Sequence, residues 1–270
     1  MRTALTIAGS DPSGGAGIQA DVKTFAAFGL YGASAVTAIT VQSTKGVDGI
    51  APLSADLVTA QIEAIAGDLH IAVTKIGMLA TSAIVEAVAA AIEELDLPLV
   101  VVDPVLVSTS GARLLDDDGV AALCAGLIPL ARVVTPNVPE AEALSGIRIA
   151  SPADARKAAR RIQEMGAAAV IITGGHNADA TALVADVIDL VLDGDTFSEF
   201  RTPRIDSTHT HGTGCTFASA VAAGLALGHS LADAAARAQQ YVAGAIAHAP
   251  GLGHGRGPLD HFWEWRSRSG

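Results

Sequence analysis

The chain has 270 residues, of which 50% are hydrophobic, and this is enough to bury the core of one large α/β domain. Its 17 basic and 28 acidic residues give a net charge of −11, which argues against nucleic acid or an anionic membrane as the main partner. The two cysteines, Cys124 and Cys215, follow no disulfide or metal spacing, so we expect a reducing, cytoplasmic location.

Short runs of β-branched residues alternate with alanine-rich helical patterns from the N-terminus onward. Strands are predicted at residues 4–8, 33–40, 73–76, 99–102, 133–135 and 169–173. Helices are predicted at residues 18–30, 54–68, 81–95, 117–130 and 151–165. This alternation is typical of βαβ units around a parallel sheet, and the sequence shows no signal peptide and no apolar run of membrane-spanning length.

The alternation changes after the sixth predicted strand. Residues 181–204 have the pattern of an antiparallel ribbon with a turn at 193–195, and two last helices are predicted at 213–227 and 231–249. No internal repeat or break in composition occurs, so residues 1–270 are predicted to form a single domain.

A glycine-framed turn directly precedes the helix predicted at residue 213. Gly212 and Gly214 allow close approach of the backbone, and the start of a helix offers unpaired N–H groups and a positive dipole end to an anion such as phosphate. Cys215 lies in the same first turn, where the dipole favours a thiolate that could act as base or nucleophile. A capped helix with a small buried cysteine explains the segment equally well.

Ligands of open parallel sheets gather at the carboxyl ends of the strands, so the residues that follow each strand are candidates for a site. A glycine-rich loop from Gly9 to Gly17 follows the first strand, and it lacks the Lys-Ser/Thr pair of a P-loop. Gln42 follows the second, with an amide that can pair with the edge of a heterocyclic ring. A flexible turn and a solvated side chain are the alternatives at these two places.

Carboxylates follow two further strands. Asp103 stands after the fourth strand, and Asn137 and Glu140 follow the fifth, three residues apart, where they can share the face of a helix. Beside a phosphate site, carboxylates suggest Mg²⁺, which prefers oxygen ligands and keeps several waters. Asn137 and Glu140 are explained as well by a helix cap with an acidic first turn.

Taken together, these segments resemble the hydroxymethylpyrimidine kinase and hydroxymethylpyrimidine phosphate kinase (phosphomethylpyrimidine kinase) family of thiamine biosynthesis, in the ribokinase-like superfamily. The resemblance rests on ALTIAGSDPSGGAGIQAD at residues 4–21, KIGML at 75–79, DPV at 103–105, TPNVPEAEAL at 135–144, GGH at 174–176, HGTGC at 211–215 and GHGRGP at 253–258. It implies a three-layer ribokinase-like α/β fold with a mainly parallel central sheet flanked by helices. It also implies transfer of phosphate from ATP, with Mg²⁺, to 4-amino-5-hydroxymethyl-2-methylpyrimidine and then to its monophosphate.

The resemblance also implies roles for residues of the glycine-framed turn before residue 213 and for two carboxylates. Gly212, Thr213 and Gly214 would form an anion hole, and Cys215 would take the position of the catalytic base. Asp103 and Glu140 would act on Mg²⁺, in part through water.

For the acceptor, the resemblance implies that Gln42 holds the edge of the aminopyrimidine. Asp21, Gly9 and Met78 would line the pocket, with Met78 as an adaptable apolar wall.

For ATP, the resemblance implies contacts from Asn137 and from Thr173, Gly175 and His176. Many family members have Lys immediately before the GGH segment, and Thr173 stands there in this chain, which leaves open which cation meets the ATP phosphates. Residues 107–111 are expected to form a mobile flap over the site.

The resemblance further suggests a homodimer. Two other functions stay open: a pyridoxal kinase built on the same framework, and a catalytically silent module that binds a pyrimidine. Gln42 favours the aminopyrimidine over pyridoxal as the acceptor.

Overall fold

The structure is a computed structural model, and it describes residues 1–108, 111–176 and 186–268, with residues 176, 267 and 268 described by their backbone alone. The strands are β1 Thr3–Ser10, β2 Tyr31–Ser43, β3 Gly46–Pro52, β4 Ile71–Ile76, β5 Val100–Val102, β6 Val133–Val134, β7 Ala169–Ile172, β8 Asp186–Asp193 and β9 Thr196–Pro203. The α-helices are α1 Gly17–Ala27, α2 Ala55–Ala66, α3 Ser82–Glu94, α4 Asp117–Ala122, α5 Val138–Ser145, α6 Pro152–Gln163, α7 Thr213–Ala226, α8 Leu231–Ala247 and α9 Trp263–Arg268.

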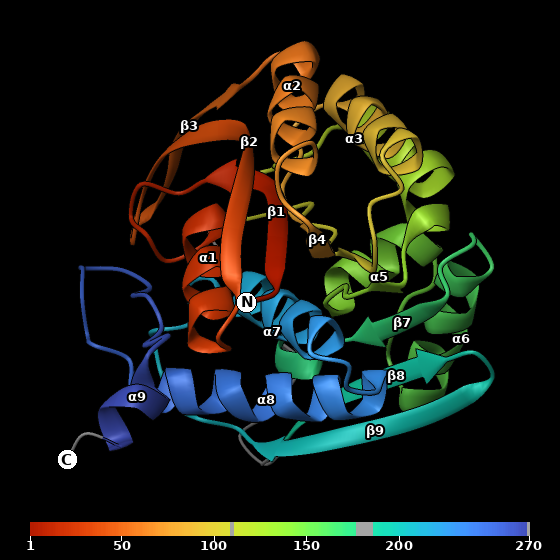
Figure 1. Ribbon diagram of the computed structural model, residues 1–270. Helices are drawn as coiled ribbons and strands as arrows, with labels where there is room; N and C mark the ends of the chain where they lie inside the picture. The colour runs from red at the N-terminus through yellow and green to blue at the C-terminus, as the bar shows by residue number, and fades with distance from the viewer. Residues whose placement is uncertain (109–110, 177–185, 269–270) are drawn as a thin grey trace.

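Within the described residues, the strands form one sheet in the order β3-β2-β1-β4-β5-β6-β7-β8-β9 (Figure 1). The neighbours from β2 to β7 run parallel, whereas β3, β8 and β9 pair antiparallel with their neighbours. The mainly parallel sheet and the ribbon after it are therefore confirmed. The first residues predicted for the ribbon, 181–185, lie outside the described residues.

Two hydrophobic clusters fill the two faces of the sheet, because alternate residues of a strand point to opposite sides. Leu5 and Ile7 of β1 pack into the cluster that holds α2, α3, α5 and α6, whereas Ala4 packs against α1, α7 and α8. In β5, Val102 packs into the first of these clusters and Val101 into the second. The molecule is thus a sandwich of helix, sheet and helix, which confirms the predicted three-layer fold (Figure 1).

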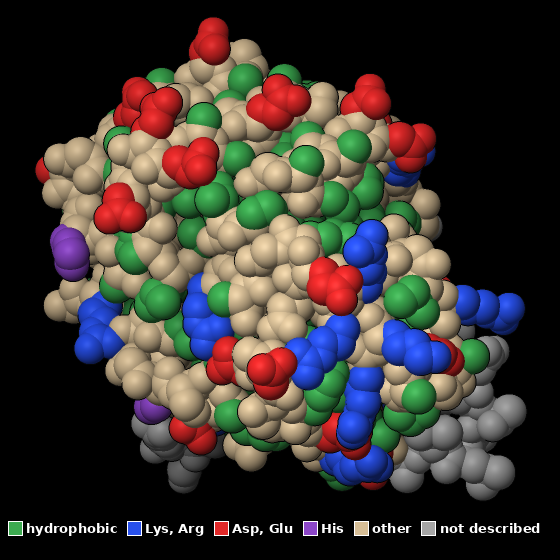
Figure 2. Space-filling model, turned by 90° about the vertical axis from the view of Figure 1, so that its right-hand side faces the viewer, with side chains coloured by type: hydrophobic (Ala, Val, Ile, Leu, Met, Phe, Trp, Pro, Cys, Tyr) green, Lys and Arg blue, Asp and Glu red, His purple; other side chains and the backbone are tan. Residues whose placement is uncertain are grey.

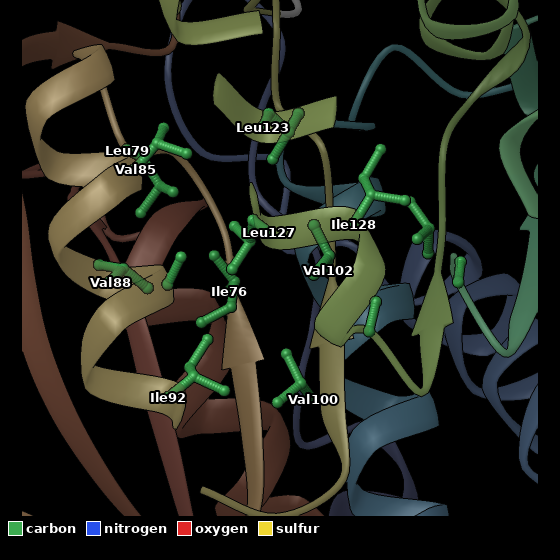
Figure 3. Packing of buried hydrophobic residues seen from close by; sticks show 14 of the residues in the cluster. Ile76, Leu79, Val85, Val88, Ile92, Val100, Val102, Leu123, Leu127 and Ile128 are labelled. Carbon is green, nitrogen blue, oxygen red and sulfur yellow. The ribbon is translucent and has the colours of Figure 1, made fainter. Parts of the chain in front are cut away.

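The packing of α3 shows how one layer is held to the sheet. Figure 3 shows Ile76 of β4 and Val100 of β5 facing Val88 and Ile92 of α3, and all four side chains are buried. Each aliphatic side chain buried in this way contributes about 1.5–3 kcal/mol relative to an exposed one. Among the helices of the described residues, none combines the length and the apolar composition that crossing a membrane requires.

Two predicted elements differ from the structure. The helix predicted at residues 117–130 ends as α4 at Ala122 and continues as a π turn, Leu123–Leu127, and a 3-10 turn, Ile128–Leu130. Pro129 lies in the last turn, where it removes an N–H donor and prevents regular α-helix. The second strand runs on to Ser43 and pairs with β3, which the sequence pattern did not predict because it contains Gly, Asp and Pro.

Basic side chains join α6 to the ribbon at the edge of the sheet. On the face shown in Figure 2, Lys and Arg side chains gather on the lower half and acidic ones prevail on the upper half. Arg156 and Arg160 of α6 lie over the ring of Phe197, at 5.3 and 5.1 Å from its centroid, and they pair with Glu199 and Asp195. Each such exposed pair contributes at most about 1 kcal/mol to stability, and each ring contact contributes about 0.5–1 kcal/mol.

Candidate active site

A cavity of about 490 Å³ opens at the carboxyl ends of β1, β4, β5, β6 and β7, against the start of α7. A cavity of this size suits a small organic ligand. Most of the predicted site residues line it: Gly9, Gln42, Met78, Asp103, Asn137, Glu140, Thr173, Gly175, Gly212, Thr213, Gly214 and Cys215. Seven separate stretches of the sequence thus meet here: six lie in or just after strands whose carboxyl ends share one edge of the sheet, and Gly212–Cys215 join them from the start of α7.

The turn before α7 has the geometry of an anion site. Gly212 is the N-cap of α7 at φ +80°, and a Cβ there would collide with the carbonyl oxygen of Gly15. Only glycine fits this combination of positive φ and close backbone contact. At Gly214 a Cβ would meet nothing within 4 Å, so the first turn of α7 opens into the cavity with the positive end of its dipole.

An ion pair joins this turn to the glycine-rich loop after β1. His211 Nε2 lies 2.7 Å from Asp11 Oδ2, and the Asp11 carboxylate also accepts from the backbone N–H groups of Ser13 and Ala16. Burial alone would raise the pKa of Asp11, but the hydrogen bonds from His211 and Ser13 outweigh it and lower that pKa to about 2. The pair therefore braces the loop against the turn. No local sequence pattern predicts this contact, because the two residues are 200 positions apart.

The floor of the cavity holds a buried ammonium that the sequence pattern did not predict. Lys75 and Asp21 are both fully buried, with 3.0 Å between Lys75 Nζ and Asp21 Oδ1, and Nζ also lies 3.8 Å from Asp103 Oδ2. Asp21 accepts further hydrogen bonds from Thr6 and Ser219. The prediction that Asp21 lines the pocket is therefore wrong, because α1 turns this side chain under the cavity floor, where it holds Lys75.

The Cys215 thiol is kept neutral mainly by its burial. Burial raises the pKa of Cys215 to about 12, and the charges of Asp103 and Asp21 add to this effect while Lys75 opposes it. The expectation that the start of the helix favours a thiolate is therefore wrong for the structure as described. Burial and the nearby carboxylates outweigh the dipole, and a thiolate at this position needs additional positive charge.

Asn137 and Glu140 form a capping box at the start of α5. Asn137 Oδ1 accepts from the N–H of Glu140 at 3.0 Å, and Glu140 Oε2 accepts from the N–H of Asn137 at 2.9 Å. The helix-cap alternative is thus what the structure shows for these two residues. Both also line the cavity, so capping fixes their place in the site without removing them from it.

The two carboxylates of the site fit Mg²⁺. Asp103 Oδ2 is buried without a hydrogen-bond partner in the described structure, and burial raises the pKa of Asp103 to about 6. Burial, with the charge of Asp103, also raises the pKa of Glu140 to about 8. A divalent cation would relieve both carboxylates. Since the described residues hold no cluster of three or more acidic, His or Cys side chains suited to a metal, water and phosphate oxygens would complete its shell.

Gln42 lies within β2, not after it, and its side chain reaches the cavity. Its Oε1 accepts from Thr40 at 3.0 Å, and its Nε2 lies 3.4 Å from His211 Nε2. Since His211 Nε2 must donate to the Asp11 carboxylate, it cannot accept from Gln42. Among the described residues the amide NH₂ of Gln42 thus has no acceptor, and it is available to a ring nitrogen of a ligand.

The wall next to Gln42 is apolar. Met78 faces Gly9, where a Cβ would lie 3.2 Å from the Met78 sulfur. Gly9 thus lets the thioether approach β1, and Met78 can adapt to the ring it contacts.

At the other end of the cavity, the chain turns after β7. The N–H of Thr173 donates to the carbonyl of Pro136 at 2.9 Å, and residues Gly174–His176 form a 3-10 turn. Gly175 lines the cavity, whereas the side chain of His176 lies outside what the structure describes. Of the predicted flap, Val107 and Ser108 line the cavity, and residues 109–110 lie outside the described residues.

The chain is similar to known proteins of one family. The model of a family described as phosphomethylpyrimidine kinase matches residues 11–260. The chain belongs to the phosphomethylpyrimidine kinase family. A hydroxymethylpyrimidine/phosphomethylpyrimidine kinase of Bacillus subtilis is 47% identical over 259 residues, which cover 96% of this chain and 94% of that protein.

Two further proteins are similar to this member of the phosphomethylpyrimidine kinase family. The thiamine biosynthesis bifunctional protein ThiED of Geobacter sulfurreducens is 47% identical over 96% of the chain, and the chain spans 52% of that protein's length. The pyridoxal kinase from Staphylococcus aureus, solved in complex with AMP-PCP and pyridoxal, matches with a TM-score of 0.89 at 38% identity, covering 98% of this chain and 95% of that one. The family model and the Bacillus subtilis relative confirm the predicted family, and the Staphylococcus aureus structure agrees with the predicted fold.

Proposed function

We propose that this chain transfers the γ-phosphate of ATP to 4-amino-5-hydroxymethyl-2-methylpyrimidine, and then transfers a second phosphate to the monophosphate. The observation that carries the proposal is the open turn Gly212–Gly214 with Cys215 beside it and Gln42 on the wall of the same cavity. The turn can hold a transferring phosphate, the Cys215 sulfur can accept a hydroxyl proton, and Gln42 can bind a ring. Family membership and the names of the relatives support the same reaction.

In this mechanism the chain positions the reactants and neutralises charge, which is most of what phosphoryl transfer needs. The N–H groups at the start of α7 hold the γ-phosphate, and Gln42 and Met78 hold the ring so that the hydroxymethyl oxygen faces it. The oxygen attacks phosphorus, its proton passes to the Cys215 sulfur as a thiolate, and ADP leaves with the electron pair of the broken P–O bond. Lys75 lowers the pKa of Cys215, and Mg²⁺ beside it would supply the further positive charge that this thiolate needs.

Asp103 and Glu140 would hold Mg²⁺, which would neutralise part of the phosphate charge. Chelation with EDTA is expected to abolish turnover, and added Mg²⁺ to restore it. The variant Glu140→Gln lacks the negative charge of one metal ligand. The Mg²⁺ concentration that gives half-maximal activity should therefore be roughly 10- to 100-fold higher for this variant. Titration of the initial rate with Mg²⁺ measures this. Full activity in EDTA, or an unchanged Mg²⁺ requirement in the variant, would remove the metal from this site.

Gln42→Ala is expected to raise KM for the pyrimidine roughly tenfold with a small change in kcat, because one buried hydrogen bond to the ring is lost. Gln163→Ala is the matched control, since Gln163 lies on α6 and bonds the carbonyl oxygen of Gly194 far from the cavity lining. Steady-state kinetics at saturating ATP give both constants. An unaltered KM in Gln42→Ala would take this residue out of ring recognition.

A second candidate function is pyridoxal kinase, because the Staphylococcus aureus enzyme solved with pyridoxal matches nearly the whole chain. We expect kcat/KM for the pyrimidine to exceed that for pyridoxal by at least about tenfold, the discrimination that one specific polar contact gives. Side-by-side assays, with products identified by mass for the alcohol and then for its monophosphate, decide between them. Parity or reversal would favour pyridoxal, and binding without turnover of either would indicate a silent module.

We also propose that the enzyme works as a homodimer in the cytoplasm. Ile39 and Val41 of β2 are exposed by 52% and 63%, and apolar side chains gathered on one strand favour burial against a second copy. Light scattering of the purified chain measures the assembly, and a monomer mass at micromolar concentration would contradict it.

A further inference from the structure

A buried carboxylate lines the cavity in the middle of β8, toward the opposite edge of the sheet from Gln42 of β2. Asp189 is 4% exposed, and among the described residues it forms no ion pair. Its Oδ1 accepts from the N–H of Gly174 at 2.9 Å, and its Oδ2 accepts from Gln239 Nε2 on α8 at 2.8 Å. No role assigned above uses this residue.

The hydrogen bonds continue into β9. Gln239 Oε1 accepts from the hydroxyl of Thr202 at 2.6 Å, and Gln239 Nε2 also donates to the carbonyl of Phe200 at 3.1 Å. The two groups that face Asp189, the Gly174 N–H and the Gln239 NH₂, are both donors. Each therefore needs an acceptor, and the two carboxylate oxygens provide one for each. An amide in place of the carboxylate would turn an NH₂ group toward a donor. The position therefore requires Asp chemically, and not only a polar side chain of that size.

The group that Asp189 holds is the turn after β7. A side chain on Gly174 would collide with the backbone of Ile188, so β8 lies directly against this turn. The next residue, Gly175, lines the cavity and accepts from Arg204 at 3.4 Å through its carbonyl. Asp189 thus fixes the turn from below, and a shift of the Gly174 N–H would move the cavity wall at Gly175.

We propose that Asp189 is a positioning residue for the nucleotide: through Gly174 it holds the turn at Gly175 in the place where ATP and ADP bind. This inference rests on the proposed kinase function, and it deepens that function by assigning the buried bonds of Asp189 and Gln239 to nucleotide affinity. The two residues line the same cavity as the turn, at the end away from Gln42 and Met78.

The protonation of Asp189 supports this role. Burial raises the pKa of Asp189 to about 6, although the hydrogen bonds from Gly174 and Gln239 oppose it. Because the folded pKa lies above the unfolded one, the charged form is disfavoured by folding, and this group makes the fold less stable above pH 6 than below pH 4. The groups that face the carboxylate are the Gly174 N–H of the 3-10 turn and the Gln239 amide of α8. Arg204, which follows β9, donates to Gly175 instead.

The test is the variant Asp189→Asn, with Asp193→Asn as its matched control. Asp193 lies on the same strand but is exposed and pairs with Arg132 at the surface. Calorimetry with ADP, in the absence of an acceptor, should give a Kd roughly tenfold higher for Asp189→Asn and unchanged for Asp193→Asn. KM for ATP should rise in the same proportion, while kcat and KM for the pyrimidine stay within about twofold of wild type.

The dependence on pH adds a readout that a purely structural role would not move. Protonated Asp189 resembles asparagine, so the ratio of the two Kd values for ADP should approach one as the pH falls below about 6. Because ADP titrates equally in the two measurements, its own titration does not affect this ratio. The milder variant Gln239→Met, which removes one donor, should raise the Kd for ADP roughly threefold if Asp189→Asn does not fold.

Each outcome decides the proposal. An unchanged Kd for ADP in Asp189→Asn, or in Gln239→Met should the first not fold, would overturn it, even where the melting temperature falls. A rise in KM for the pyrimidine equal to that for ATP would also overturn it. A wild-type chain that binds no ADP would overturn the kinase function together with this inference, whereas a wild type that binds ADP and turns over leaves the variants to judge Asp189 alone.

Discussion

Cys215→Ala is expected to lower kcat by roughly 10²- to 10⁴-fold, the range that one general base contributes, while the Kd for ADP stays unchanged. The sulfur lies in the first turn of α7, beside the turn that would hold the transferring phosphate, so its loss removes the proton acceptor and leaves the nucleotide contacts in place. Rates at saturating substrates and calorimetry with ADP measure the two quantities separately.

Cys124→Ala is the matched control for this variant. Cys124 is the other free cysteine and lies in the π turn after α4, packed against the hydrophobic cluster and away from the cavity. It should keep the wild-type kcat. Unchanged turnover in Cys215→Ala would refute the role of the thiol, and an equal loss in both variants would show that the effect comes from stability.

Lys75→Met is expected to destabilise the fold by about 3–5 kcal/mol, because removal of one partner leaves a buried charge uncompensated. Lys75 Nζ is the cation between Asp21 and Asp103, and all three side chains are nearly or fully buried. Urea denaturation measures the free energy of unfolding. Lys157→Met, at an exposed pair with Asp154, should change it little.

The double variant Lys75→Met with Asp21→Asn separates the charge from the packing. Since it removes both members of the pair, it should recover part of the lost stability, with a coupling energy of about 1–3 kcal/mol. Two single changes that add without coupling would show that Lys75 and Asp21 do not interact as their 3.0 Å separation indicates.

The inner strands could be predicted from the sequence because their apolar, β-branched runs are buried on both faces. The cavity residues that follow strands, such as Asp103 and Asn137, could be predicted from the same pattern, since a parallel sheet collects its strand ends at one edge. β3 could not be predicted, because as an edge strand it tolerates Gly, Asp and Pro and carries little hydrophobic signal.

The connections within the site could not be predicted in the same way. Lys75 stands in an apolar strand, and its partner Asp21 is 54 positions away, so only the packing of α1 against the sheet brings them together. His211 and Asp11 are 200 positions apart. The neutral thiol of Cys215 likewise depends on burial and on carboxylates from other elements, which the local helix pattern does not contain.

A crystal structure of the protein with a non-hydrolysable ATP analogue and the pyrimidine alcohol tests the account most directly. We expect the γ-phosphate against the backbone N–H groups of Gly212–Gly214 and the hydroxymethyl oxygen within hydrogen-bond reach, about 3–3.5 Å, of the Cys215 sulfur. A triphosphate that ends elsewhere, with its terminal phosphate turned away from the start of α7, would contradict the proposed reaction.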